Sequence, residues 1–131
     1  MNQLTLEKLL NLLKDIPTEW GKEPVDIRFD FGTAYPIGFS SWRGNYREVA
    51  INYSLSGYDG KQFAHTDLKD FVVMIQKSIG KEFYGWKGGD FTMTEDTPVW
   101  VANDGNVGNT AVVGIKNEDY TVIILTEYKE Y

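Results

Sequence analysis

The sequence predicts a single α+β domain, in which two helices pack on a mostly antiparallel sheet of five or six strands. Two segments have a helical spacing of apolar residues, several segments alternate between apolar and polar residues, and short turns join the segments of the C-terminal half. Short links favour antiparallel neighbours, and the apolar faces must be buried between layers. Because 131 residues is the size of one domain, we assign residues 1–131 to it.

The two predicted helices are bounded by residues that favour helix starts or ends. Residues 6–16 carry apolar side chains at a spacing of three or four, Thr5 is the expected N-cap, and Pro17 ends the helix. The second helix is expected over residues 68–79, after an N-cap at Thr66. We expect the apolar face of each helix to lie against the sheet.

Five segments have the pattern of β-strands: residues 25–31, 49–55, 98–103, 110–116 and 120–128. The first two alternate between apolar and polar residues, which is typical of strands with one buried face. Residues 120–128 are apolar on both faces near their centre, which predicts a central position in the sheet. The segments 32–44 and 83–91 show no such period, and we predict that they are loops.

The composition excludes several classes of site. The chain has 19 acidic and 13 basic residues and a net charge of -6, which argues against direct nucleic-acid binding because that needs clustered cations. It has no cysteine and one histidine, so thiolate metal sites, a cysteine nucleophile and a multi-histidine site within the chain are excluded. We predict no cofactor and no bound metal. No apolar run is long enough to span a membrane, and we expect no membrane partner.

The first candidate ligand site is the segment S-S-W-R-G-N-Y-R, residues 40–47. The residues predicted to bind a ligand are Ser41, Trp42, Arg43, Gly44, Tyr46 and Arg47. A guanidinium forks onto phosphate or carboxylate, an aromatic ring stacks on a base, and glycine allows the backbone to approach closely. In the alternative interpretation, Trp42 and Tyr46 fill the core, and Arg43 packs over a ring or pairs with a carboxylate.

The second candidate segment is Y-G-W-K-G-G-D, residues 84–90. The residues predicted to bind a ligand here are Trp86, Lys87, Gly88 and Gly89. Adjacent glycines expose backbone N–H groups and Lys87 adds a positive charge for an anion, although the phosphate-binding G-x-x-x-x-G-K-[ST] motif is absent. The alternative is a glycine-rich turn with Trp86 buried. A third candidate is Asn103, which ends a predicted strand just before a hairpin turn and would contact the ligand through its side-chain amide.

Aromatic residues are numerous for a chain of this length. The sequence has 4 Trp, 8 Tyr and 7 Phe, and many of them fall in or beside segments that contain glycine. Surplus aromatic residues near loops usually face a ligand or a partner protein. An interface within a homo-oligomer would bury them equally well, so the sequence leaves both interpretations open.

Three blocks of the sequence are distinctive in combination: S-S-W-R-G-N-Y-R-E-V-A at 40–50, G-W-K-G-G-D-F-T-M at 85–93 and T-P-V-W-V-A-N at 97–103. They resemble the patterns S-[YW]-R-G-x-Y, G-[YW]-K-G-G and T-P-[LV]-W-V-A-N of a family of small bacteriophage proteins whose activity is not established. The resemblance covers most of the chain from Leu4 to Ile115. It implies a bacteriophage origin, an accessory role and a location in the host-cell cytoplasm.

These observations lead to the hypothesis of a bacteriophage accessory binding protein that is not an enzyme. Residues 40–47 and 84–90 would form one aromatic-walled, locally cationic pocket for a small anionic, nucleotide-like ligand. The base would stack on the aromatic rings, and the phosphate would be held by Arg43, Lys87 and glycine amides. Such a protein would act as an anti-defence sponge that sequesters an immune signalling nucleotide of the host.

A second hypothesis comes from the acidic surface. The protein would be an anti-CRISPR-like inhibitor that binds a host defence nuclease through carboxylates that fit a basic groove. The acidic residues in question are Glu95, Asp96, Glu118, Asp119, Glu127 and Glu130. Charge reversal at Arg43 separates the hypotheses, because only the pocket hypothesis predicts a loss of activity. A third interpretation is a metal-assisted phosphodiesterase. Such an enzyme needs carboxylates that lie close together in space, and the sequence indicates no such group.

Overall fold

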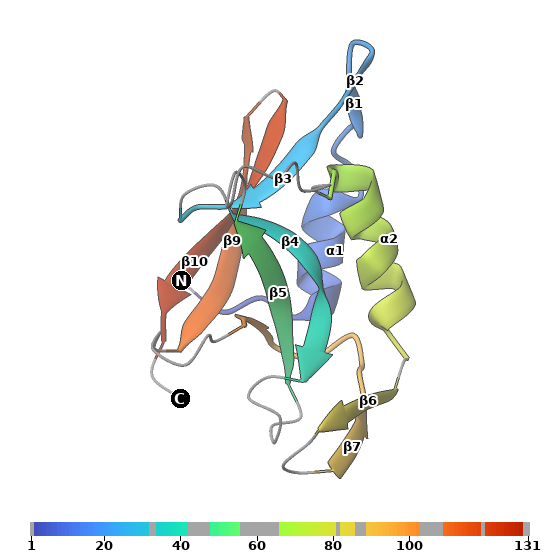
Figure 1. Ribbon diagram of the computed structural model, residues 1–131, viewed down its shortest axis with the longest axis vertical. Helices are drawn as coiled ribbons and strands as arrows, with labels where there is room; N and C mark the ends of the chain where they lie inside the picture. Colours follow the sequence, from blue (N-terminus) through green and yellow to red (C-terminus); the bar gives the residue numbers. More distant parts are fainter. Residues whose placement is uncertain are drawn as a thin grey trace.

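The computed structural model describes residues 2–31, 34–41, 48–55, 66–80, 82–85, 89–102, 109–118 and 120–129. The helices in these ranges are α1 (Leu6–Leu13) and α2 (Leu68–Ser78). The strands are β1 (Glu19–Trp20), β2 (Glu23–Pro24), β3 (Asp26–Phe29), β4 (Ala34–Ser41), β5 (Val49–Leu55), β6 (Glu82–Gly85), β7 (Gly89–Thr92), β8 (Val99–Val101), β9 (Thr110–Glu118) and β10 (Thr121–Tyr128). Figure 1 shows their arrangement.

Six strands form one mixed sheet in the order β3-β10-β9-β8-β5-β4. The pairs β10–β9, β9–β8 and β5–β4 are antiparallel, whereas β3–β10 and β8–β5 are parallel. The outer strands β3 and β4 also contact one another, so the sheet curves into a nearly closed barrel (Figure 1). The predicted α+β domain, with two helices on a mostly antiparallel sheet of five or six strands, is confirmed.

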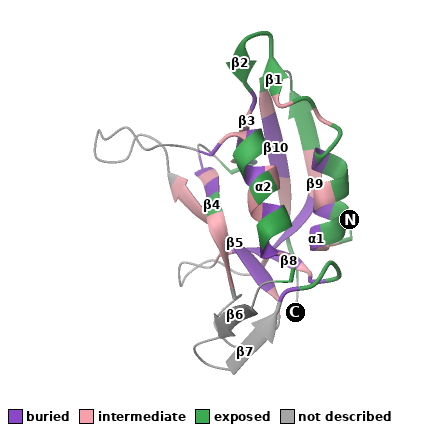
Figure 2. Ribbon diagram, turned by 90° about the vertical axis from the view of Figure 1, so that its right-hand side faces the viewer, coloured by how far each residue is buried: buried purple, intermediate pink, exposed green. Residues whose placement is uncertain are grey.

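Both helices pack on the concave face of the sheet. They contact each other, α1 contacts β9, and α2 contacts β3 and β4. The buried stripes of the helices and the inward-facing residues of the strands form one core, which Figure 2 shows in purple. Its fully buried members include Leu9, Phe71, Phe29 and Ile124. The strand β10 lies between β3 and β9, so its predicted position inside the sheet is confirmed.

The helix starts match the sequence pattern at one helix and differ by one residue at the other. The Thr5 side chain accepts a hydrogen bond from the Lys8 backbone N at 3.3 Å, as expected for an N-cap. The cap of α2 is Asp67, which accepts from the Asp70 backbone N at 2.9 Å, and not the predicted Thr66. Thr66 is buried, and Asp67 also forms a bridge to β3.

The structure contradicts two of the predicted loops. Residues 34–41 form strand β4 at the outer position of the sheet, and β6 and β7 form a separate two-stranded antiparallel sheet. The alternation in β4 is interrupted at Pro36 and Gly38, where the register with β5 shifts. Proline and glycine oppose the strand pattern in sequence, but an outer strand tolerates them because it lacks one ladder of hydrogen bonds.

A surface ion pair lies at the turn between β9 and β10. Lys116 Nζ lies 2.9 Å from Glu118 Oε1, and this hydrogen bond and the lysine charge lower the pKa of the Glu118 carboxyl. The pair therefore stabilises the fold at neutral pH and loses this contribution as the pH falls through the lowered pKa. Both side chains are exposed, so the contribution is small.

Candidate ligand pocket at the end of the barrel

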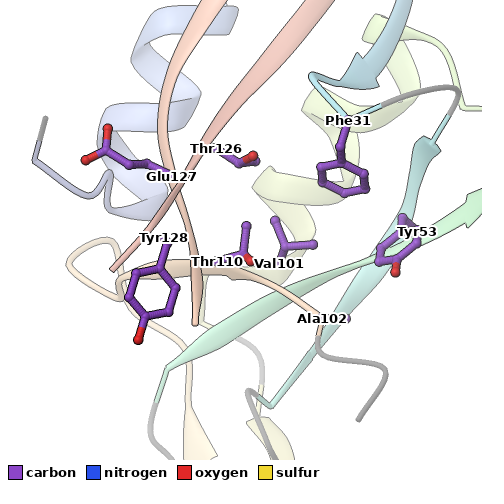
Figure 3. A pocket seen from close by; sticks show the side chains of 8 residues that line it. All are labelled: Phe31, Tyr53, Val101, Ala102, Thr110, Thr126, Glu127 and Tyr128. Atoms are coloured by element: carbon purple, nitrogen blue, oxygen red, sulfur yellow. The ribbon is translucent and has the colours of Figure 1, made fainter. Parts of the chain in front are cut away.

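The described residues form a pocket at one end of the barrel-like sheet, which we call the barrel-end pocket (Figure 3). Its volume is ≈ 450 Å³. The lining residues are Phe31, Tyr53, Val101, Ala102, Thr110, Thr126, Glu127 and Tyr128. They come from β5, β8, β9 and β10 and from the residues that follow β3 and β8. Pockets for small ligands typically have volumes of about 300–1,000 Å³, so this pocket has room for one small molecule.

The pocket continues the hydrophobic core along the strands. On four strands, a pocket residue stands two positions beyond a fully buried core residue, and successive side chains of a strand alternate between faces. These pairs are Phe29 and Phe31, Ile51 and Tyr53, Val112 and Thr110, and Ile124 and Thr126. The pocket is therefore the place where the inner face of the sheet extends past the packed core.

A β-bulge determines which residues of β9 and β10 face the pocket. Leu125 pairs with Gly114, whereas Thr126 pairs with Val112, so Val113 is an extra residue on β9. The extra residue keeps Thr126 and Val112 on the same inner face beyond the irregularity. Thr110 then pairs with Tyr128 at the rim of the pocket. Without the bulge, Thr126 would pair with Val113, and Val113 and Ala111 would face the pocket in place of Val112 and Thr110.

Two aromatic rings form a corner on one wall of the pocket. The ring centroids of Phe31 and Tyr53 lie 5.4 Å apart, and their planes are inclined by 77°. Phe31 also stacks on the buried ring of Phe29, at 5.0 Å and 17°. A corner of this kind, which we call the aromatic corner, offers the face of one ring and the edge of another to a flat molecule.

Asp30 holds the opposite side of the pocket in place. Its carboxylate accepts hydrogen bonds from the Thr126 backbone N at 2.8 Å and from the Thr126 hydroxyl at 2.6 Å. The paired residues of β3 and β10 end at Phe29 and Ile124, so the Asp30 side chain extends the connection between these strands. Phe31 follows directly and lies over the pocket (Figure 3).

We expect Asp30→Asn to lower the free energy of unfolding by about 1 kcal/mol. The amide oxygen can still accept from the Thr126 backbone N–H, but the amide nitrogen replaces the oxygen that accepts from the Thr126 hydroxyl, and both hydrogen bonds lose the charge of the carboxylate. Urea denaturation followed by circular dichroism measures the change, with Asp15→Asn, at an exposed position, as the matched control. Equal stability of the two variants would contradict the role of Asp30 in joining β3 to β10.

The described lining of the pocket is neutral to acidic. Its one charged residue is Glu127, whose carboxylate points away from the aromatic corner (Figure 3), and it includes no lysine or arginine. The segments that continue from Phe31 and Ala102, residues 32–33 and 103–108, also contain no lysine or arginine in the sequence. The nearby Lys129 ammonium donates a hydrogen bond to the Gln3 side-chain oxygen at 3.2 Å. The described lining of the pocket therefore offers no cation to an anionic ligand.

Most of the residues predicted to bind a ligand lie outside the described residues. These are Trp42, Arg43, Gly44, Tyr46, Arg47, Trp86, Lys87, Gly88 and Asn103. Ser41 ends β4 and Gly89 begins β7. The elements that carry the two segments, β4 and β6, contact each other. That Arg43 and Lys87 lie together in one pocket stays a prediction.

The structure places two of the three sequence blocks side by side. The end of the first block lies in β5 and the third block includes β8, and these strands pair in parallel, with Ala50 opposite Trp100. Trp100 is 1% exposed, in a second cluster of buried residues that is separate from the main core. Its indole Nε1 donates to Glu48 Oε1 at 3.1 Å, which ties the two blocks together.

Sequence reasoning missed the aromatic corner and the polar wall of the pocket. Phe31, Tyr53 and Thr126 each lie in or beside a predicted strand, where a residue on the inner face is expected to be core. The signal in the sequence that could have indicated these residues is the position at which each apolar run ends. Phe31 ends one alternating run, and the run on β10 changes from apolar residues to Thr126 and Glu127.

No protein-family model matches the chain, and comparisons with curated proteins and with solved structures give no match. Within the described residues, no group of three or more His, Asp and Glu side chains is placed to hold a metal ion. Neither helix in the described part of the chain is long and apolar enough to cross a membrane.

Proposed function

We propose that this protein binds a small nucleotide-like molecule and sequesters it without converting it. The observation that carries the proposal is the barrel-end pocket, which combines an aromatic corner with the hydroxyl groups of Thr110 and Thr126 on its other walls. A base can lie against Phe31 or Tyr53, and Thr110 and Thr126 offer hydrogen bonds to polar groups of the ligand. The resemblance to small bacteriophage proteins supports a role as an anti-defence sponge in the cytoplasm of the host cell.

The cations predicted from the sequence are a separate part of the proposal. Arg43, Arg47 and Lys87 are predicted from the sequence to hold a phosphate, but they lie outside the described residues, so the proposal for the barrel-end pocket does not depend on them. Residues 42–47 come just before β5 and Asn103 comes just after β8. Because β5 and β8 are parallel, the start of β5 at Val49 and the end of β8 at Val101 lie at opposite ends of the strand pair, and Val101 lines the barrel-end pocket.

The acidic-inhibitor hypothesis has less support from the described residues. Glu118 pairs with Thr121 at one end of the β9–β10 ladder, and Glu127 lies near the other end. Six residues of strand separate Thr121 from Glu127, which corresponds to about 20 Å. The exposed carboxylates of this ladder are therefore divided between its two ends and do not form one surface that could enter a single basic groove.

Isothermal titration calorimetry against cyclic nucleotides and ADP-ribose-derived nucleotides tests the proposal. We expect at least one of these molecules to bind with a stoichiometry of one per pocket and to be recovered unchanged after the protein is denatured. Arg43→Glu, with the exposed charge reversal Lys22→Glu between β1 and β2 as its control, tests the separate prediction that segment 40–47 holds a phosphate. Weaker binding in Arg43→Glu alone would support that part of the proposal, and equal binding in the two variants would refute it. The absence of heat with every nucleotide at high protein concentration would refute the proposal, and release of a product would indicate an enzyme.

A further inference from the structure

We propose that the barrel-end pocket takes the nucleoside part of the ligand, the base with its sugar, and leaves any phosphate group outside. This inference rests on the proposed function and specifies which part of a nucleotide this pocket recognises. It follows from the hydrogen-bonding direction of Thr126, from the aromatic corner and from the charge of the lining.

The direction of the Thr126 hydroxyl excludes a phosphate at this wall. Its proton is committed to Asp30 Oδ1 in a short hydrogen bond of 2.6 Å, so toward the pocket the hydroxyl oxygen can only accept. A phosphate oxygen at neutral pH accepts as well, so it finds no donor in the Thr126 hydroxyl. The groups that fit here are donors, such as sugar hydroxyls and exocyclic amines.

The aromatic corner supplies the complementary half of the site. A flat base that stacks on the face of Tyr53 or Phe31 meets the edge of the other ring, since the two planes are inclined by 77°. Figure 3 shows these rings on the side of the pocket that faces Thr126 and Val101. A ligand with a flat ring at one end and hydroxyl donors at the other fits both walls at once.

The volume and charge of the pocket agree with this part of a nucleotide. A cavity of ≈ 450 Å³ is near the lower end of the usual range of ligand pockets, so it suits one base and its sugar rather than a dinucleotide. The lining is mainly apolar and aromatic, with a few polar groups that fix the orientation, as in other small-molecule sites. No lysine or arginine of the described lining is available to neutralise a phosphate.

Calorimetry with the four common ribonucleosides and their 5′-monophosphates tests the inference on the full chain. We expect at least one ribonucleoside to bind, and its 2′,3′-dideoxy analogue to bind about tenfold more weakly because the sugar donors are missing. An equal affinity of the dideoxy analogue would overturn the assignment of the sugar to the Thr126 wall. Monophosphates that bind while no nucleoside does would overturn the inference and leave the proposed function standing. Absence of binding in both series would overturn the inference, and the proposed function would be refuted only if the cyclic and ADP-ribose-derived nucleotides also gave no heat.

Variants connect the binding to the pocket. Phe31→Ala removes one ring of the aromatic corner from a residue that is 36% exposed, and we expect it to weaken nucleoside binding about tenfold. Ile37→Ala on β4 is the matched control, since it truncates an exposed apolar side chain that is not part of the lining. Thermal unfolding of both variants checks that the fold is retained. Nucleoside affinity that is unchanged in Phe31→Ala would overturn the inference.

Discussion

Replacing Phe29 by alanine is expected to lower the free energy of unfolding by about 3–5 kcal/mol. The Phe29 ring is fully buried and contacts Phe31 and Tyr53, whose centroids lie 5.0 and 6.1 Å away. Its removal leaves a cavity between the core and the barrel-end pocket, and the surrounding strands cannot close it. Because a domain of this size has about 5–15 kcal/mol of stability in total, the variant should be close to unfolding.

Denaturation with guanidinium chloride measures this change, with Leu12→Ala as the control. Leu12 is 46% exposed on α1, so its truncation is expected to change the stability by no more than about 0.5 kcal/mol. A loss below about 1 kcal/mol for Phe29→Ala would show that β3 is not packed between the helices and the pocket as described.

Filling the pocket has the largest expected effect on binding. Thr110→Trp places an indole on the inner face at the start of β9, opposite Tyr128, where it occupies the space of the ligand. Tryptophan has a high preference for strands, so the sheet should tolerate it at this rim position. We expect the affinity for any pocket ligand to fall at least about hundredfold, which calorimetry measures directly.

The matched control for this variant is Thr121→Trp. Thr121 begins β10 at the other end of the same ladder, opposite Glu118 and away from the pocket lining. Both variants replace a threonine by tryptophan, so only the position of the substitution differs. If Thr121→Trp weakened binding as much as Thr110→Trp does, the ligand could not lie in the barrel-end pocket.

The sequence was sufficient to predict the layers of the fold but not all of its strands. Strong periodicity at α1, α2 and β5, and the apolar run of β10, predicted helices and strands correctly because their apolar side chains are buried in one core. β4 escaped detection because Pro36 and Gly38 interrupt its alternation, and its position is set by pairing with β5. The N-cap at Asp67 was missed because threonine and aspartate both favour the N-cap position. Only the burial of Thr66, which the sequence does not show, distinguishes the two residues.

The pocket could not be predicted from sequence because it depends on long-range register. Phe31 and Tyr53 come from strands on opposite sides of the curved sheet, and they meet only when the sheet closes around the core. The bulge at Val113 and the Asp30–Thr126 contact likewise join residues distant in sequence. Sequence reasoning instead favoured segments rich in glycine, arginine and tryptophan, since short-range composition signals them directly.

The most direct test of the central claim is to map the ligand on the protein by NMR. Uniformly ¹⁵N-labelled protein is titrated with the ribonucleoside or ribonucleotide that binds most tightly, and the shifts of the backbone amides are followed. We predict the largest changes at Phe31, Tyr53, Ala102, Thr110 and Thr126. Changes concentrated instead around the exposed Trp20–Tyr120 ring pair, with the pocket amides unmoved, would contradict the claim.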